Sequence, residues 1–434
     1  MTVLFDANLD IINQRWPLLG LVLNTASVLD LNAHLVQGTE QTISVNGIQL
    51  SSRHNRIAEA QLLINQLPRN CSEATVYGVG MGDVPTILVQ NPAIKHIRIC
   101  LLNVNLLALL LTYTDQRQWL SDQRLELEYQ LQHHRLAQQY IAITSELLLS
   151  SDENARLRDL IVFNNNLTYA NKSHDNRNID IKLKQRMIEN LATIKQDSDA
   201  ADLSSYYQPN KTLVIATGPT LELHYAYLRV QRALPESTRP LMISVDTALK
   251  ALLNENIIPD IVVSIDQNIS RQLLPDNIPM SVKLVYFPKL KQEILQWWPG
   301  QRFAAYSLSK TYDELHQKFP KLRLFANGSV IHPAIDLAVY LNSPAITLFG
   351  CDFSYPHNKT HAFWEDGKLG PSVTNAKQHW VMNGLGEKVA TDLNFRGYLL
   401  ALEHYIHSKP HVIFYNASLD GAAIDGTQYQ ECKS

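Results

Sequence analysis

Two glycine-containing turns in the second half of this chain carry residue types that bind anions. Thr217-Gly218-Pro219-Thr220 follows an apolar run at 212–216, Asn327-Gly328-Ser329-Val330 follows one at 322–326, and a helical pattern begins after each turn. Backbone N–H groups and the dipole at a helix N-terminus favour a phosphate or a carboxylate. Thr220 and Ser329 also suit the cap of a helix. The residues we expect to bind an anion are Gly218, Pro219, Thr220, Asn327, Gly328 and Ser329.

Three aspartates stand at the ends of apolar runs in the same half of the chain. They are Asp246, Asp266 and Asp352, which follow the runs at 241–245, 261–265 and 345–349. Carboxylates in such places bind Mg²⁺, accept hydrogen bonds from ribose hydroxyls, or cap the following turn. Spacing alone leaves these three roles open. Together with the two glycine turns, the aspartates predict a nucleotide pocket.

The elements that must position these residues are predicted from Lys211 onward, where short β-branched runs alternate with helical patterns. The expected strands are 212–216, 241–245, 261–265, 283–287, 302–306, 322–326, 345–349 and 411–415. Such alternation is typical of a mainly parallel, Rossmann-like α/β sheet with helices on both faces. Ligands of these sheets bind beyond the carboxyl ends of the strands, near the point where the strand order reverses. Both turns and all three aspartates follow strands in this way.

The chain has 434 residues, more than one core usually holds, so we expect two domains and a connector. Residues 1–114 are expected to form a smaller Rossmann-like α/β domain, with a hairpin at 42–50 and a GVGMG turn at 78–82. Residues 115–204 contain much Gln, Leu, Arg and Asn and almost no Gly or Pro, which favours a helical connector. The larger α/β domain is expected at 205–427.

Charge and composition argue against several classes of protein. The formal net charge is −3 and no run of Lys or Arg exceeds two residues, which argues against nucleic acid as the main partner. The N-terminus lacks a signal-peptide pattern, and the apolar stretch at 97–112 is shorter than the roughly 20 residues that span a membrane. We therefore expect a cytoplasmic protein with no membrane partner.

The four cysteines give no sign of a metal site or a disulfide framework. They are Cys71, Cys100, Cys351 and Cys432, and no two form a CxxC pair. We therefore predict reduced thiols and no metal site. Cys351 follows the apolar ITLFG segment, which favours a buried thiol at a strand end over a nucleophile.

Several stretches of the second half resemble the central domain of the Maf (motility-associated factor) flagellin glycosyltransferases. They are IATGPTL at 215–221, the stretch from 243 to 268, the stretch from 327 to 363 and NASLDGAAIDGT at 416–427. GCDFSYPHNKTHA at 350–362 is the most specific part. The same segments are similar to bacterial sialyltransferases that use CMP-sialic acid. The resemblance covers nearly all of residues 205–427.

This resemblance implies transfer of a nonulosonic acid, of the pseudaminic or legionaminic type, from a CMP-sugar to Ser or Thr of flagellin. The CMP-sugar is a substrate, so no cofactor and no metal are implied. His379 lies where these enzymes place a general base, and His361 lies near the place of a group that assists the phosphate. Tyr355, one residue later than the strict match, is the second candidate for assisting the phosphate. Another surface-glycan acceptor and a homo-oligomer both stay open.

The N-terminal half is similar to the Maf N-terminal domain, in a SxxxNxxxEA segment at 51–60 and in the GVGMG turn at 78–82. The similarity ends at the strand near Ile97, where an acidic residue is usual and Asn103 stands instead. A glycine turn with that acid would suggest S-adenosylmethionine or dinucleotide binding, because the acid contacts the ribose. Its loss favours a structural domain over a working cofactor site.

Three alternatives stand beside the glycosyltransferase interpretation. The central domain also resembles the archaeal 6-hydroxymethylpterin diphosphokinase, in which ATP and Mg²⁺ would make the three aspartates metal ligands. Those proteins are single short domains, whereas this chain has a large N-terminal half. A methyltransferase centred on 78–82 lacks the acid. A non-catalytic flagellin-binding accessory protein would act through its helical connector.

Overall fold

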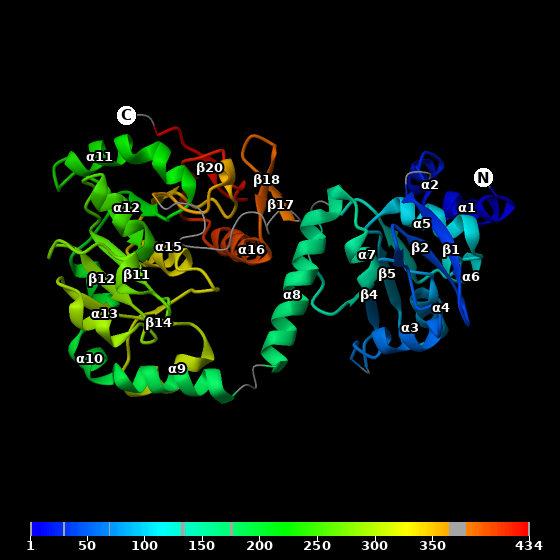
Figure 1. The fold of residues 1–434 in the computed structure, drawn as a ribbon, viewed down its shortest axis with the longest axis horizontal. Coiled ribbons are helices and arrows are strands. Elements are labelled where there is room, and N and C mark those ends of the chain that lie inside the picture. Colours follow the sequence, from blue (N-terminus) through cyan, green and yellow to red (C-terminus); the bar gives the residue numbers. More distant parts are fainter. Residues whose placement is uncertain are drawn as a thin grey trace. The chain divides into compact units, whose positions relative to one another are not determined.

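A computed structural model gives the structure of the chain and describes residues 2–28, 31–68, 70–131, 134, 136–173, 177–363 and 379–432. The chain forms two compact units, Met1–Asn166 and Leu167–Ser434. Each unit has its own sheet and its own buried core. Figure 1 shows both units, with the chain coloured from blue to red.

The first unit is built on a four-stranded parallel sheet in the order β6-β5-β4-β7. Its strands are β4 (Glu73–Tyr77), β5 (His96–Cys100), β6 (Leu125–Glu128) and β7 (Ile141–Ala142). A separate antiparallel sheet contains β1 (Ala33–Gln37), β2 (Gln41–Val45) and β3 (Ile48–Gln49), which includes the predicted hairpin. The strand order of the parallel sheet reverses between β4 and β7.

Helices cover the first sheet and supply most of its core. They are α1 (Val3–Arg15), α2 (Pro17–Asn24), α3 (Arg56–Ile64), α4 (Asp83–Gln90), α5 (Val104–Tyr113), α6 (Arg117–Leu120), α7 (Thr144–Leu148) and the first part of α8 (Ala155–Ser173). In α5, every residue from Leu106 to Leu111 is buried. A helix that is apolar on all sides is buried on all sides. The apolar stretch at 97–112 is therefore strand β5 followed by a core helix.

The connector differs from the expectation of a helical segment at 115–204. Residues 125–128 and 141–142 are strands of the first unit's sheet, and the division between units falls after Asn166. The physical reason lies in LELE at 125–128, where alternate residues Leu125 and Leu127 are buried against the unit's core. The first unit thus extends well beyond residue 114.

The second unit contains a nine-stranded sheet in the order β20-β19-β16-β9-β10-β11-β12-β13-β8. Its strands are β8 (Ser198–Asp199), β9 (Thr212–Ile215), β10 (Leu241–Val245), β11 (Ile261–Ser264), β12 (Lys283–Tyr286), β13 (Arg302–Ala304), β16 (Ala345–Phe349), β19 (Ile413–Asn416) and β20 (Gln428–Tyr429). All neighbouring strands are parallel. The strand order reverses between β9 and β16.

Two helices precede the first strand of this sheet, and helices or short 3₁₀ turns follow most of its strands. They are α9 (Arg177–Glu189), α10 (Leu191–Gln196), η4 (Pro219–His224), α11 (Tyr225–Ala233), η5 (Asp246–Ala248), α12 (Leu249–Asn254), α13 (Gln292–Trp297), α14 (Asp313–Lys318), α15 (Ile331–Tyr340), η8 (Pro356–Asn358) and α16 (Leu393–His407). None of the helices in the described part of the chain is long and apolar enough to cross a membrane.

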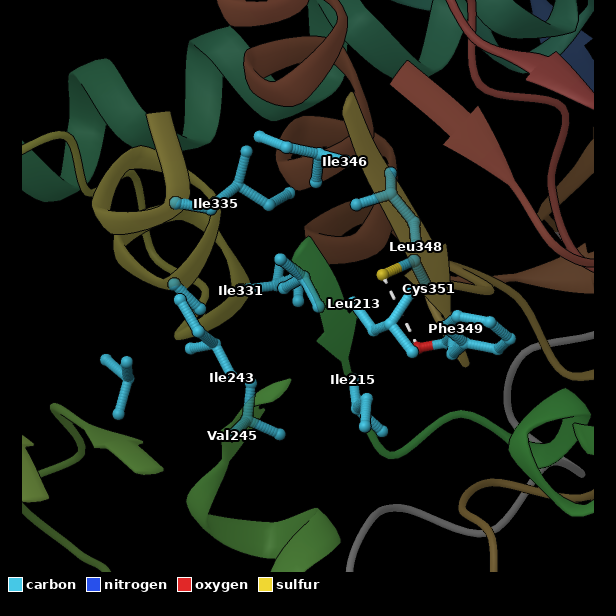
Figure 2. Packing of buried hydrophobic residues seen from close by; sticks show 14 of the residues in the cluster. Leu213, Ile215, Ile243, Val245, Ile331, Ile335, Ile346, Leu348, Phe349 and Cys351 are labelled. Atoms are coloured by element: carbon cyan, nitrogen blue, oxygen red, sulfur yellow. Dashed lines mark hydrogen bonds between the residues drawn. The ribbon is translucent and has the colours of Figure 1, made fainter. Parts of the chain in front are cut away.

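Both faces of the large sheet are buried, which confirms the predicted Rossmann-like class. Alternate residues of β11 belong to two different cores, Val263 to one and Val262 to the other. Figure 2 shows Ile331 and Ile335 of α15 beside Leu213 and Ile243 of the central strands. The Cys351 thiol is buried in this core and donates to the Phe349 carbonyl at 3.7 Å.

Two predicted strands are shorter than expected. In place of the strand expected at 302–306, the structure has β13 and β14 (Tyr306–Ser307). In place of the strand expected at 322–326 it has only β15 (Arg323–Leu324), which pairs with β14 outside the main sheet. Beyond Leu324 the backbone leaves the ladder, because the Phe325 N–H donates to Asp336 Oδ2 in α15 at 2.6 Å. The second glycine turn is thus tied to α15 and not to the sheet.

Candidate functional site

A pocket of about 510 Å³ opens where β9 and β16 end, at the point where the strand order reverses. This is the position that the parallel-sheet rule predicts for a ligand. Its walls come from the segments after β9, β10, β11, β12 and β16 and from the N-terminal ends of α15 and α16. A cavity of this size is in the range that holds a small-molecule ligand.

Most of the residues proposed from the sequence meet in this pocket. Those that line it are Gly218, Asp246, Asp266, Gly328, Ser329, Asp352, Tyr355 and His361. Four others do not line its described part, namely Pro219, Thr220, Asn327 and His379. The pocket also contains residues that the sequence analysis missed, among them Lys289, Asp392 and Tyr398.

The first glycine turn has its N–H groups engaged by the protein. The Gly218 N–H donates to the Gly350 carbonyl at 2.9 Å, and the Thr220 N–H donates to Asp352 Oδ2 at 2.9 Å. The Thr220 hydroxyl donates to the other oxygen of the same carboxylate at 2.5 Å. The helical pattern that follows begins as the 3₁₀ turn η4, so no α-helix N-terminus stands here. Thr220 and Asp352 therefore join β9 to β16.

The second glycine turn is open toward the pocket. The N–H groups of Gly328, Ser329 and Val330 donate no hydrogen bond within the described residues, and they precede the ten-residue helix α15. Gly328 has a φ of +84° and lies against the Tyr398 ring, where a Cβ would come within 2.3 Å of Cε1. Free amides at a helix N-terminus form an anion site.

A buried histidine holds this open turn in place. His332 is fully buried, and its Nδ1 accepts from the Asn327 N–H at 3.2 Å while Nε2–H donates to the Tyr398 carbonyl at 3.0 Å. Burial lowers the pKa of His332 to about 4, so the ring is neutral and can fill both roles. The backbone N–H of Asn327 thus fixes the turn, and the anion-binding role expected of this residue stays a prediction.

The three strand-end aspartates differ in their surroundings. Asp246 is buried and accepts from the Ser264 hydroxyl at 2.6 Å and from the Thr247 N–H at 2.8 Å. Burial raises the pKa of Asp246 and of Asp352 to about 6 in each case. Asp266 is exposed and accepts from the Asn268 N–H at 2.8 Å. Two of the three carboxylates are thus engaged as caps and cross-links.

Lys289 is the cation of the described pocket lining, and the sequence analysis missed it. It follows β12 by three residues, so the rule that polar strand ends form the site would have found it. Its ammonium makes no hydrogen bond or ion pair with described residues. Burial lowers the pKa of Lys289, and the charge of Asp266 opposes that effect.

His361 lines the pocket with an unsatisfied nitrogen. Its Nδ1 is buried and has no hydrogen-bond partner among the described residues. Burial lowers the pKa of His361 to about 4. The next residue ties this loop to the first glycine turn, because the Ala362 N–H donates to the Thr217 carbonyl at 2.8 Å. A buried polar atom without a partner points to a ligand or a water that completes the site.

Tyr355 lines the pocket with its hydroxyl already paired. The hydroxyl donates to Asp392 Oδ2 at 2.8 Å, and Asp392 Oδ1 accepts from the Phe395 N–H at the start of α16. Burial and this carboxylate raise the pKa of Tyr355 well above its ordinary value. The Tyr355 hydroxyl is therefore protonated, with its proton directed at Asp392.

His379 is the first residue of β17 (His379–Met382), which pairs with β18 (Lys388–Thr391) in an antiparallel hairpin. It stands opposite Thr391, next to the Asp392 cap of α16, and is partly buried. The segment 364–378 that precedes it lies outside the described residues. Of the two proposed histidines, His361 therefore lines the described pocket and His379 does not.

The glycine turn of the first unit is filled by the protein itself. Oε1 of Glu146, in α7 after β7, accepts from the N–H groups of Val79 and Gly80 at 2.6 and 2.5 Å. Burial raises the pKa of Glu146 to about 7. Asn103 serves as the cap of α5 and donates to the Leu149 carbonyl at 2.8 Å. The carboxylate stands where a ligand of this turn would bind.

Comparisons with known proteins add the following. Residues 185–358 match a family model described as 6-hydroxymethylpterin diphosphokinase MptE-like. A solved MAf glycosyltransferase from Magnetospirillum magneticum AMB-1 is 14% identical, with a TM-score of 0.45 over 99% of this chain and 74% of that one. No curated protein matches the chain. The matched residues 185–358 include both glycine turns and the three aspartates.

Proposed function

We propose that this chain is a glycosyltransferase that moves a nonulosonic acid from a CMP-sugar to a hydroxyl of its acceptor. The observation that carries the proposal is the open N-terminus of α15 beside Lys289. Three amides and one ammonium that have no partner among the described residues line the same pocket. Such a set of donors matches an anionic donor sugar, which has one phosphodiester and one carboxylate.

The engagement of the carboxylates supports a donor with one phosphate over a metal-bound triphosphate. Mg²⁺ sites need ionised oxygens that are free to coordinate. Both oxygens of Asp246 and of Asp352 accept hydrogen bonds from the protein, and burial favours the neutral form of each. Asp266 alone keeps an exposed carboxylate in the described pocket lining. A single exposed carboxylate suits a ribose hydroxyl well.

The reaction needs a base, a stabilised leaving group and a positioned acceptor. The acceptor oxygen bonds to the anomeric carbon, the bond from that carbon to the phosphate oxygen breaks, and CMP leaves with the electron pair. The hydroxyl proton passes to a base, for which we propose His379. His361, whose neutral ring lines the pocket and whose Nδ1 has no partner among the described residues, is proposed to pair with the departing phosphate. Tyr355 would support it from the same wall.

The acceptor and the cellular location follow from the resemblance described above. We propose Ser or Thr of flagellin as the acceptor, with another surface glycan as the alternative. The protein would then act in the cytoplasm, before the acceptor is exported. These assignments rest on the segments at 215–221 and 327–363 and not on any contact within the pocket.

Calorimetric titration tests the proposal, with CMP, ATP and S-adenosylmethionine each added with and without Mg²⁺. We expect CMP to bind without metal, and an intact-mass assay on flagellin with the CMP-sugar to show the added sugar. His379→Ala should keep CMP affinity but slow transfer by about 100-fold. His404→Ala, on α16 outside the described pocket lining, serves as the matched control. Unchanged transfer in His379→Ala would remove that residue from the mechanism.

A second candidate function is a Mg²⁺-dependent pyrophosphoryl transfer, which the MptE-like match at 185–358 favours. ATP would then place its phosphates at the α15 N-terminus, and Asp266 would be the first metal ligand. Binding of ATP only in the presence of Mg²⁺, with no CMP binding, would replace the glycosyltransferase proposal with this one. Binding of none of the three ligands would favour the non-catalytic accessory protein.

A further inference from the structure

A group of metal-binding side chains stands at the edge of the sheet in the first unit. Tyr77, Cys100 and Glu128 are the last residues of β4, β5 and β6, and each is the register partner of the next. Because parallel strands end at the same edge, their side chains lie side by side. His134 reaches the same place from the loop after β6. Four chemically different side chains thus meet at one edge.

Three of these side chains are close enough to share one ion. One ligand atom from each of Cys100, Glu128 and His134 lies within 4.8 Å of the other two. Cys100 Sγ is 3.8 Å from Glu128 Oε2, and His134 Nδ1 is 3.2 Å from the same oxygen. In a tetrahedral zinc site, bonds of about 2.0 to 2.3 Å place ligand atoms roughly 3.3 to 3.6 Å apart. The distance between Glu128 and His134 is already of this size, whereas Cys100 Sγ, which lies 4.0 Å from His134 Nε2, must move closer to complete the geometry.

Neighbouring groups hold two of these ligands in the required orientation. Arg98 pairs with Glu128 Oε1 at 2.9 Å, which leaves Oε2 for the cluster. The Tyr77 hydroxyl pairs with His134 Nε2 at 2.9 Å, which leaves Nδ1 on the side of Glu128. Partners of this kind fix the orientation of metal ligands and raise metal affinity. The thiol of Cys100 is fully buried.

We infer that Cys100, Glu128 and His134 bind one zinc-class divalent ion in the first unit. A thiolate with an imidazole and a carboxylate selects Zn²⁺ over Mg²⁺ and Ca²⁺, which prefer oxygen ligands alone. Three protein ligands leave the fourth position to a water. The site is separate from the pocket of the second unit, with which it shares no residue. Binding displaces the thiol proton to solvent as the thiolate bonds to the ion.

The test uses the full, reduced chain after removal of bound metal with a chelator. Zn²⁺ is titrated against a chromophoric chelator, and Co²⁺ serves as a spectroscopic probe. We expect one ion per chain and a thiolate-to-cobalt charge-transfer band in the unmodified protein. His134→Ala and Cys100→Ser should each weaken zinc binding by about 100-fold or more, and Tyr77→Phe by about tenfold.

Cys71→Ser is the matched control, because Cys71 belongs to the same unit and lies outside the cluster. It should keep both the affinity and the cobalt band. Circular dichroism shows whether each variant is folded, and the cobalt spectrum of the unmodified chain decides the question even if Cys100→Ser does not fold. The inference is overturned if no cobalt–thiolate band forms, or if folded His134→Ala binds zinc as tightly as the unmodified chain.

Discussion

Replacing Gly328 by alanine tests whether the open turn before α15 is shaped by its contact with α16. Gly328 has a φ of +84°, and a Cβ there would meet the Tyr398 ring at 2.3 Å. Gly386, in the turn between β17 and β18, provides the matched control. It has a φ of +80°, and nothing lies within 4 Å of a Cβ built on it. The two substitutions share the backbone penalty, and only Gly328→Ala adds a clash.

The magnitude follows from these two contributions. A left-handed backbone costs an alanine about 1 kcal/mol, which is the expected loss in free energy of unfolding for Gly386→Ala. Displacing a packed ring costs about 1 to 3 kcal/mol more. We therefore expect Gly328→Ala to lose about 3 kcal/mol. Because the shifted turn carries the free amides, CMP affinity should also fall, by about tenfold.

Urea unfolding of both variants measures the stability loss, and calorimetry measures CMP affinity. The pair Gly328→Ala and Tyr398→Ala forms a double-mutant cycle, in which removal of the ring should restore at least about 1 kcal/mol. Equal losses for Gly328→Ala and Gly386→Ala, with no coupling to Tyr398, would refute the idea that α16 shapes the turn. Unchanged CMP affinity in a destabilised Gly328→Ala would place the phosphate elsewhere in the pocket.

Three further changes probe separate parts of the chain. Lys289→Met should raise the melting temperature, because it removes a half-buried ammonium that has no partner among the described residues. The same change should weaken CMP binding about tenfold. The exposed variant Lys318→Met is the control and should change neither quantity. Burial raises the pKa of Glu146 to about 7, so its neutral form stabilises the fold below pH 4 and this contribution is lost as pH rises through 7. The free energy of unfolding of Glu146→Gln, relative to that of the unmodified chain, should therefore rise by about 3 kcal/mol from pH 4 to pH 8 in urea unfolding. The exposed variant Glu126→Gln is the control and should show no such rise. Asp392→Ala removes the cap of α16 and the partner of a buried hydroxyl, so thermal unfolding should show a loss of about 2 kcal/mol, and a loss below 0.5 kcal/mol would contradict that role.

The positions of the strands and of the pocket could be predicted from the sequence. Mostly apolar runs such as LMISV at 241–245 identify buried parallel strands, and the residue after such a strand reaches the ligand edge by topology alone. That rule led to Asp246, Asp266 and Asp352, and it would also have led to Lys289. The strand-end rule thus locates the pocket without any knowledge of packing.

Whether the polar groups of the site are free or already hydrogen-bonded within the protein could not be predicted in the same way. Whether the amides of a glycine turn are free depends on side chains that arrive from distant segments. Asp352 closes the first turn from the end of β16, and Glu146 closes the turn of the first unit from α7. Likewise the cluster of Cys100, Glu128 and His134 has no CxxC spacing, because its members come from β5, from β6 and from the loop after β6. The closed turns and the side-chain cluster result from contacts between segments that are far apart in the sequence, so the spacing of residues along the chain does not predict them.

The pairing of β9 with β16 has a consequence for how the second unit is synthesised. These two strands are neighbours in the middle part of the sheet, although they lie far apart in the sequence, as the pairing of Thr212 with Ile346 shows. On the ribosome, the strands from β9 to β13 emerge long before β16, so one edge of β9 stays unpaired until then. The pocket therefore forms late, since a chain that ends before residue 345 lacks β16 and the pocket wall that follows it.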